Sequence, residues 1–481
     1  MLKLSTHSLQ WLATLSVVLS ACGTAPAPAS PGAAGATAAP PTAAPGAPTA
    51  APKPTAAAAP TSAPAAPTSA PAATTAPAAT TAPATAPGAT PAAPTGNELH
   101  IAIVHPFTGK YAGVGTAAME GAQAGAAAIN AAGGILGHNV VMDEVDTVGD
   151  PADAVPALNK ELSVNKPVAV IGPGGLEVGA VQPILDRNKI PFMLQAGNTA
   201  FDKTDDPFLW RANPSDSQLG VAMALYAAKK GYKKAALMFS TIESAQTLKD
   251  PITSTFTAQG GQIVGDVNLS PGQSSYRSEA LKVINAGPDV IFSQMEPSTA
   301  APLFSNFKEL GALNIPIVGS DITAGSDFID AVTAQAAHDV LVSAEGADVS
   351  GAASDTFKQF YGQLYSHQPL ADANYAYDAA IILGLAITKA GGTDGTQVAA
   401  AIPAVAASAG GQTVTNYQDG VAAIKAGKPT RYEGAAGPYD YNDQHNVFGA
   451  FDIVQADADS GKLQTIMTLS ADELKAATVT H

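Results

Sequence analysis

A change of composition near residue 97 divides the chain into two kinds of material. Residues 23–96 contain only Ala, Pro, Thr, Gly, Ser and a single lysine, Lys53, and they hold 18 of the 37 prolines. Prolines at this density remove N–H donors and restrict the residues before them, so they block helix formation despite the many alanines. Because no large apolar side chain is available for burial, we expect 23–96 to be a disordered, semi-extended linker.

The segment before the linker indicates export. Residues 1–22 have the pattern of a signal peptide, with Lys3 ahead of an apolar run that is too short to span a bilayer of about 30 Å as a helix. The run ends in Leu-Ser-Ala-Cys-Gly, which resembles the lipobox of bacterial lipoproteins, where the cysteine thiol is lipidated and the chain is cut before it. We therefore expect Cys22 to be a lipidation site rather than an ordinary buried thiol, and the protein to be extracytoplasmic and anchored to the cell membrane.

Charge and cysteine content exclude several classes of function. The chain carries 24 Lys and Arg against 40 Asp and Glu, and no acidic residue precedes Glu98, so the acidic excess belongs to the second material. Nucleic-acid binding requires a basic face, and we therefore expect no nucleic-acid partner. A single cysteine excludes an internal disulfide and a cysteine-based zinc site.

Residues 97–481 alternate short apolar runs with helical stretches. These 385 residues exceed the roughly 250–300 at which one core stops growing, so two lobes are expected. Near-continuous apolar runs are typical of parallel strands buried on both faces, and the βαβα order predicts doubly wound α/β sheets. The expected strands are Leu99–His105, Val140–Val145, Val168–Ile171, Ala235–Phe239, Val290–Phe292 and Ile317–Gly319. The expected helices are Thr116–Ala132, Asp153–Ser163, Gly179–Asn188, Ser217–Lys230, Ser244–Gln259 and Ser278–Asn285.

Motifs of covalent chemistry are missing from the sequence. It contains no His-Glu-x-x-His, Gly-x-Ser-x-Gly or Walker A pattern. Gly113–Ala118 matches a loose dinucleotide pattern but begins about eight residues after the strand end that the fingerprint requires. Asp440–Asp443 lacks the Gly and Glu of a calcium loop and favours a hydrogen-bonded turn. We expect no cofactor, no metal and no enzymatic activity.

An ordered series of motifs resembles one family. Ile101–Gly137 reads IAIVHPFTGKYAGVGTAAMEGAQAGAAAINAAGGILG, which is similar to the amino-terminal signature of the leucine/isoleucine/valine-binding proteins, type I periplasmic binding proteins of ABC importers. Further matches follow in order, among them WRANPSD at Trp210–Asp216, YAYDA at Tyr375–Ala379 and GPYD at Gly437–Asp440. The resemblance implies two Rossmann-like lobes joined by three crossovers, near Asn213–Ser217, Ser343–Glu345 and Gly437–Asn442.

The resemblance also implies domain boundaries and a mechanism. The first lobe would comprise about 97–214 and 344–438, and the second about 215–343 and 439–481. In such proteins the two lobes close on a small solute by a hinge motion, and the closed form docks on a membrane permease. The stretch 410–431 has no assigned role.

Site residues follow from the same resemblance. In the first lobe, similar proteins hold an amino acid's carboxylate with a hydroxyl and backbone N–H groups after the third strand. The hydroxyl residue is missing here, and Gly175 and Leu176 remain as backbone donors. Glu177 would repel a carboxylate if it faced the cleft, and we expect it instead to point outward and cap the helix. The other first-lobe contacts are Ala196 and Asn198, with Val114 or Tyr111 at the position of an aromatic wall.

The second lobe supplies the remaining contacts. Asp321 aligns with the acidic residue that binds the ligand's ammonium, although a helix cap is an equal alternative. Ser244 falls at the position of a tyrosine, and Met295 and Glu296 follow a strand where a contact is expected. The sequence thus predicts a monomeric, lipid-anchored receptor that captures a small polar solute and delivers it to ABC permease and ATPase subunits. A ligand-sensing module without transport is the alternative.

Overall fold

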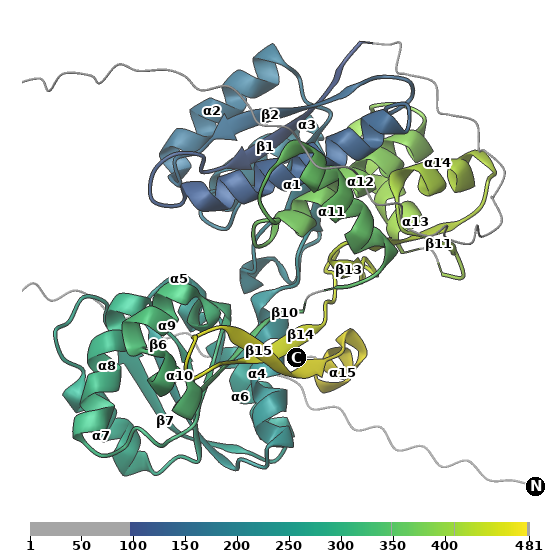
Figure 1. Cartoon of the computed structure of the whole chain (residues 1–481). Helices are drawn as coiled ribbons and strands as arrows, with labels where there is room; N and C mark the ends of the chain where they lie inside the picture. The colour runs from purple at the N-terminus through teal and green to yellow at the C-terminus, as the bar shows by residue number, and fades with distance from the viewer. Residues whose placement is uncertain (1–96, 348, 408, 479–481) are drawn as a thin grey trace, which may run out of the picture. The chain divides into compact units, whose positions relative to one another are not determined.

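The structure is a computed structural model that describes residues 97–478 except 348 and 408. The predicted signal peptide, Cys22 and the linker lie outside these residues. The described chain forms two sheets with helices on both faces, and a smaller third sheet beside the first (Figure 1). The prediction of two doubly wound α/β lobes is therefore confirmed.

The first sheet is parallel, with strand order β2-β1-β3-β4-β5. Its strands are β1 (Leu99–His105), β2 (Val140–Asp146), β3 (Ala169–Ile171), β4 (Phe192–Leu194) and β5 (Leu209–Arg211). Alternate residues of β1 pack on opposite faces, since Ile101 and Ile103 join one core cluster and Ala102 and Val104 another. Burial on both faces explains why the strand has a continuous apolar sequence.

Helices from two distant parts of the chain cover the first sheet. One face carries α2 (Pro151–Val164) and α3 (Val178–Asn188), and the other α1 (Ala112–Ala131) and α12 (Ala373–Ala390). The remaining elements of this lobe are η1 (Thr199–Phe201), α11 (Ala352–Leu364), α13 (Gly395–Ala406), β11 (Gln412–Val414), α14 (Tyr417–Lys425), β12 (Thr430–Gly434) and β13 (Gly437–Pro438). The previously unassigned stretch 410–431 thus contains β11 and α14 and begins β12.

Glycines allow α1 and α12 to pack at close range. A Cβ atom at Gly121 would lie 1.9 Å from the carbonyl oxygen of Ala373, and one at Gly125 would lie 2.7 Å from Cβ of Ala380. Neither position can therefore hold a larger residue without a shift of the helices. The loose dinucleotide motif is part of the same helix, because Gly113 and Gly115 lie within α1 rather than in a phosphate-binding loop.

The second sheet has strand order β15-β14-β10-β9-β8-β6-β7. Its strands are β6 (Lys234–Ser240), β7 (Gln262–Leu269), β8 (Val290–Gln294), β9 (Ile317–Gly319), β10 (Leu341–Gly346), β14 (Phe451–Ala456) and β15 (Leu463–Leu469). The pairs β10–β14 and β14–β15 are antiparallel and the others parallel. Its helices are α4 (Asp216–Lys229), α5 (Glu243–Gln246), α6 (Lys249–Ala258), α7 (Arg277–Ala286), α8 (Pro297–Glu309), η2 (Asp321–Ala324), α9 (Ser326–Val332), α10 (Ala334–Val340) and α15 (Ala471–Ala477).

The single helix expected over Ser244–Gln259 is wrong. The chain instead forms α5 and α6, separated by Thr247 and Leu248. Pro251 lies in the first turn of α6, where a helix tolerates the missing N–H donor; inside a continuous helix it would remove a hydrogen bond.

The chain passes between the two sheets three times. The passages lie between β5 and α4, between β10 and α11, and between β13 and β14. In Figure 1 they run through the region that joins the upper and lower halves of the folded chain.

Candidate functional site

Loops at the carboxyl ends of the first-sheet strands bring several predicted site residues together. Tyr111 and Leu176 both lie beside Gly149, because a Cβ atom at Gly149 would be 3.0 Å from Tyr111 Cδ2 and 3.7 Å from Leu176 Cδ1. The two side chains are 40% and 51% exposed, and Val114, one turn further along α1, is 55% exposed. Large apolar side chains that are left this open offer contact area to an apolar ligand.

The loop after β4 lies against the loop after β3. A Cβ atom at Gly175 would be 3.5 Å from Cβ of Ala196, which is itself buried. Within the described chain, no residue accepts a hydrogen bond from the backbone N–H groups of Gly175 or Leu176, which precede α3. Asn198 is partly engaged, since its Oδ1 accepts a hydrogen bond of 2.9 Å from the N–H of Ala200 and caps η1.

Glu177 does not point outward as expected, and that prediction is wrong. Its side chain is 1% exposed and makes no capping hydrogen bond to α3. Instead Oε1 accepts a 2.6 Å hydrogen bond from Thr147 Oγ1, from the loop after β2. The physical reason is that a buried hydroxyl at the edge of the sheet gives the carboxylate an inward partner, which a solvent-facing cap would lack.

His105 ends β1 beside Glu177 and was not predicted as a site residue. Its Nε2 lies 2.9 Å from Gln195 Oε1, and burial lowers its pKa to about 4. The other ring nitrogen, Nδ1, has no hydrogen-bond partner, and neither has Glu177 Oε2. Both atoms flank Gly174, at 3.4 Å and 3.1 Å from a Cβ built there. The only sequence signal was a polar residue at the end of an otherwise apolar strand.

The predicted residues of the second lobe have different surroundings. Ser244 is exposed in the first turn of α5, whereas the Met295 side chain is 1% exposed and packs in the core. Glu296 is half-buried, and its carboxylate accepts hydrogen bonds from Ser240 Oγ at 3.1 Å and Thr299 Oγ1 at 3.3 Å. In the second lobe, therefore, the exposed Ser244 side chain is open to a ligand, whereas the buried Met295 side chain is not.

Asp321 provides an open carboxylate at the start of η2. It is exposed, and its Oδ1 accepts one hydrogen bond of 2.9 Å from the N–H of Ile322, in its own turn. The surrounding protein nevertheless raises its pKa by desolvation. Both roles considered for Asp321 are compatible with this geometry, because one turn bond leaves the second carboxylate oxygen available.

The charge of Asp321 contributes to the pKa shifts of two further carboxylates. Desolvation and then repulsion by Asp321 raise the pKa of Asp216 to about 7 and that of Asp372 to about 6. Asp216 begins α4 of the second lobe, and Asp372 precedes α12 of the first. Tyr375, one turn into α12, has its pKa raised mainly by desolvation, with smaller contributions from Asp372 and Asp321.

Arg211 connects the loop after β4 to the third passage between the sheets. Its fully buried guanidinium donates to the carbonyl oxygens of Ala196 and Asn198, to Asp202 Oδ1 at 2.8 Å and to Asn446 Oδ1 at 2.6 Å. Asn446 belongs to the third passage, so one side chain ties this passage to the loop after β4. The sequence offered only a WRANPSD motif, without the partners of its arginine.

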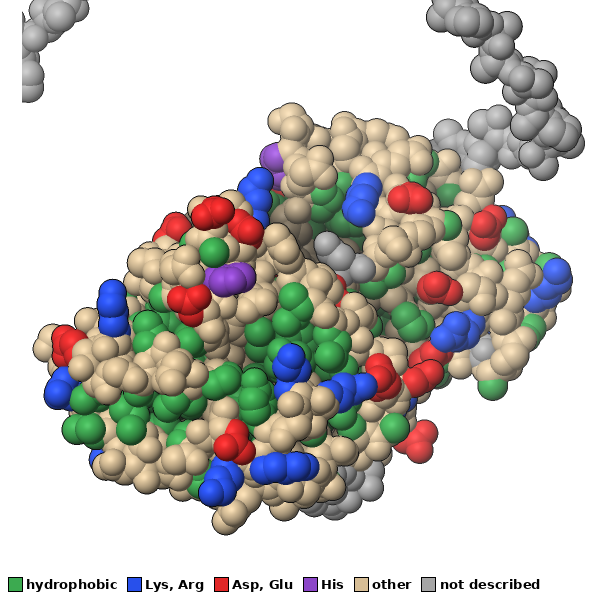
Figure 2. All heavy atoms as spheres, turned by 60° about the horizontal axis from the view of Figure 1, so that its bottom comes forward, with side chains coloured by type: hydrophobic (Ala, Val, Ile, Leu, Met, Phe, Trp, Pro, Cys, Tyr) green, Lys and Arg blue, Asp and Glu red, His purple; other side chains and the backbone are tan. Residues whose placement is uncertain are grey.

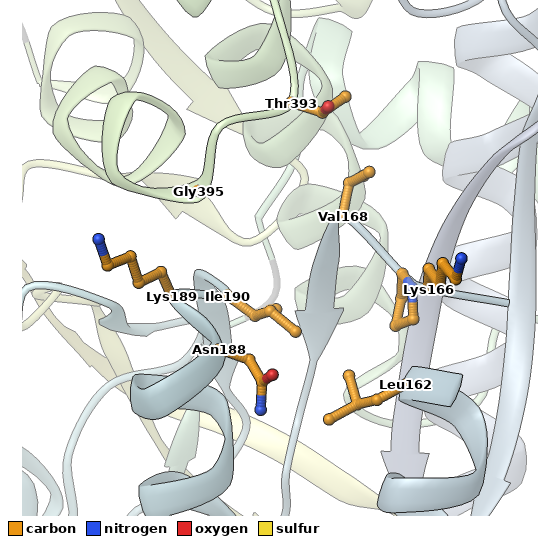
Figure 3. Close-up of a pocket in the computed structure, with 9 residues that line it drawn as sticks. Leu162, Lys166, Val168, Asn188, Lys189, Ile190, Thr393 and Gly395 are labelled. Carbon is orange, nitrogen blue, oxygen red and sulfur yellow. The ribbon is translucent and has the colours of Figure 1, made fainter. Parts of the chain in front are cut away.

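Two pockets of the described chain lie away from these loops. Figure 3 shows one of about 310 Å³ at the amino-terminal ends of β3 and β4, with Lys166 and Lys189 on opposite sides in this view. The other, of about 220 Å³, lies beside Pro316 and Ile317 at the start of β9. Ligands of doubly wound sheets bind at the carboxyl ends of strands, so neither pocket matches the expected place.

Electrostatics and composition of the described residues limit the alternatives. On the face seen in Figure 2, acidic and basic side chains are scattered among apolar and uncharged ones, without the basic area that a nucleic acid would need. Residues 97–478 contain no grouping of three metal-ligating side chains. In the same part of the chain, no helix has the length and apolar character to cross a bilayer.

Curated relatives are similar over most of their own length. The Leu/Ile/Val-binding protein BraC3 of Rhizobium johnstonii is 26% identical over 314 residues, which are 63% of this chain and 82% of that protein. The Leu/Ile/Val-binding protein homolog 3 of Brucella melitensis is 24% identical over 301 residues, 62% of this chain and 80% of that one. Both are named as binding proteins, in agreement with the prediction that the chain is not an enzyme.

Solved structures share the fold. The leucine-binding protein LivK of Thermotoga maritima has a TM-score of 0.63 at 21% identity, covering 78% of this chain and 99% of its own. A solute-binding protein of an R. palustris ABC transporter in complex with 4-hydroxybenzoate has a TM-score of 0.60 at 18% identity, covering 78% and 97%. Residues 98–462 match the model of the periplasmic binding protein family, and the chain therefore belongs to that family.

Proposed function

We propose that the protein is a lipid-anchored extracytoplasmic receptor that captures a small polar solute, an amino acid or a related compound, and delivers it to an ABC importer. Membership of the periplasmic binding protein family supports an extracytoplasmic solute-binding role. Relatives named as Leu/Ile/Val-binding proteins support an amino acid or a compound of similar shape.

One observation carries the proposal for this chain. Unused backbone donors at Gly175 and Leu176 lie in the first lobe, and an open carboxylate at Asp321 lies in the second. A solute with a cationic group would bind Asp321, an acceptor atom would bind the N–H groups, and an apolar body would contact Tyr111 and Leu176. Closure of the lobes would exclude water and strengthen these contacts.

A thermal-shift screen tests solute capture. Amino acids, amides, polyols and aromatic acids are added to the purified protein, and a ligand at 100 times its Kd is expected to add about 2.7 kcal/mol of stability. Solute capture would be refuted if no compound in the screen raised the melting temperature.

Asp321→Asn tests the assigned contact. We expect this variant to keep its fold and to lose at least about tenfold in affinity for a cationic or zwitterionic solute, because a charge-assisted hydrogen bond is replaced by a neutral one. Titration calorimetry measures the change. Asp250→Asn, which makes the same change on an exposed carboxylate of α6 in the same lobe, is the control for the substitution itself. Equal affinities of Asp321→Asn and wild type would return Asp321 to a structural role.

The anchor and the importer need separate experiments. We expect Cys22→Ala to release the protein from the membrane fraction, since the thiol is the proposed attachment point of the acyl chains. Metabolic labelling with a fatty-acid analogue should mark the wild type and leave the variant unlabelled. Delivery is measured as solute uptake by cells with and without the gene, and unchanged uptake would favour a sensing role instead.

A further inference from the structure

The loop before α3 already contains an anion. The N-terminus of a helix favours negative charge, because its first N–H groups are unpaired and the helix dipole is positive there. Here Glu177 occupies the N-cap position of α3, and its carboxylate is folded beneath the loop with 1% exposure. Thus the end of the helix that would attract an anionic group has a buried carboxylate of its own.

The charge of this carboxylate has no cationic partner. Among the described residues, the Glu177 carboxylate forms no ion pair with a lysine or arginine, and the one hydrogen bond that it accepts comes from the Thr147 hydroxyl. The nearby His105 ring is neutral near pH 7, because burial lowers its pKa to about 4. Glu177 Oε2 and His105 Nδ1, both on side chains that are 1% exposed, have no partner on either side of Gly174. A ligand carboxylate bound at Gly175 would be separated from this uncompensated charge by only one or two residues of the loop. The two negative charges would therefore repel each other.

The other contacts of the proposed site favour a cation with an apolar body. Asp321 presents its open carboxylate on the second lobe, and Leu176 presents exposed apolar surface on the first. Leu176 lies beside Tyr111, whose exposed ring has Lys110 Nζ 5.0 Å from its centroid. The free N–H groups of Gly175 and Leu176 can still donate to an uncharged acceptor, such as an amide carbonyl oxygen. Together, the Asp321 carboxylate, the Leu176 side chain and the free N–H groups suit a ligand that resembles an apolar amino acid but has no carboxylate.

We infer that Glu177 determines specificity by excluding carboxylates, and that the ligand is an apolar cationic amide or amine rather than a free amino acid. This inference rests on the proposed solute-binding function and narrows its ligand class. Glu177 acts on the ligand by the electrostatic effect of its charge, from beneath the loop, and need not touch the ligand.

Matched probes test the inference. The purified full chain is titrated with L-leucine, L-leucinamide and 3-methylbutylamine, and with L-phenylalanine, L-phenylalaninamide and phenethylamine, so that only the carboxyl end differs within each series. Repulsion between two like charges within several ångströms of each other near a protein surface lowers the binding affinity by more than about tenfold. The amide or amine is therefore expected to bind at least about tenfold more tightly than the acid.

Glu177→Gln is the central variant, because it removes the charge and can still accept the hydrogen bond from Thr147. We expect it to reduce the preference for the amide over the acid by about tenfold or more. Glu177→Ser, which restores a hydroxyl, is expected to act in the same direction, and near-ultraviolet circular dichroism reports whether each variant is folded. Glu161→Gln is the matched control, since Glu161 is also a buried glutamate of the first lobe but lies beside Asn165, at the end of α2.

The outcomes separate the inference from the proposed function. Tighter binding of the acid than of the amide by the wild type would overturn the inference and leave solute capture intact. The inference would also be overturned, with solute capture intact, if Glu177→Gln kept the wild-type preference for the amide over the acid. A change of that preference by Glu161→Gln equal to the change by Glu177→Gln would overturn it as well. Binding of none of the acids, amides or amines, nor of any other solute in the screen, would overturn both.

Discussion

Replacing Arg211 by methionine should destabilise the whole folded chain. The fully buried guanidinium donates to two segments: to Ala196, Asn198 and Asp202 in the connection between β4 and β5, and to Asn446 in the third passage. Methionine fills a similar volume but donates no hydrogen bond. The substitution therefore leaves buried carbonyl and amide oxygens unsatisfied, and it leaves Asp202 without its cation.

The size of the effect follows from these contacts. Removing one partner of a buried ion pair costs about 3–5 kcal/mol, because the remaining charge and acceptors stay desolvated. Unfolding entropy scales with length at about 2.1 cal/mol/K per residue near 60 °C, which gives about 0.8 kcal/mol/K for roughly 380 folded residues. The melting temperature of Arg211→Met should thus fall by about 4–6 °C.

Differential scanning calorimetry without ligand measures this fall. Arg277→Met is the matched control, because Arg277 forms a single ion pair with Glu309 in which the side chains are 51% and 56% exposed. Exposed pairs contribute about 0–1 kcal/mol, so the control should melt within about 1 °C of the wild type. Equal melting temperatures of the two variants would refute the assignment of Arg211 as the connection between the loop after β4 and the third passage.

Two further predictions concern packing and pH. Gly121→Ala should destabilise the protein by several kcal/mol, because its Cβ would lie 1.9 Å from a carbonyl oxygen of α12. Gly362→Ala, in α11 with no atom within 4 Å, should instead add up to about 1 kcal/mol in urea unfolding; the reverse order would contradict the close packing of α1 and α12. Burial raises the pKa of Asp216 and Asp378 to about 7. The native state then binds more protons than the unfolded chain between about pH 4 and 7, so stability should rise on acidification from pH 8 to pH 5.5. A lower urea midpoint at pH 5.5 than at pH 8 would be inconsistent with these burials.

Continuous apolar runs made parts of the fold predictable. Leu99–His105 and Ile317–Gly319 have the predicted bounds because central parallel strands are buried on both faces and require apolar residues throughout. The strand β15 was not predicted, since it is an edge strand in which apolar and polar residues are mixed and most residues are exposed. Position in the sheet is not the whole reason, because the edge strand β2 was predicted, whereas the interior strands β4, β10 and β14 were not.

The candidate site was predictable in position but not in chemistry. The family resemblance, and not a local pattern, pointed to Gly175, Leu176 and Asp321. In the structure, Gly175 and Leu176 follow β3, and Asp321 begins η2 after β9. The direction of Glu177 depended on Thr147, which is 30 residues away in the sequence and whose hydroxyl turns the carboxylate inward. Likewise, the four acceptors of Arg211 come from segments up to 235 residues distant. Such partners are set by tertiary structure and leave no local signal.

The interleaving of the lobes has a consequence for how the chain acquires its structure. The glycine face of α1 packs on α12, whose first residues are about 250 positions later, and the second sheet is completed only by β14 and β15 near the carboxyl terminus. A chain emerging from its amino terminus therefore cannot finish either core until almost all of it is available. Contacts of such long sequence separation slow folding. The topology itself thus delays completion of both cores until the carboxyl-terminal segments are available.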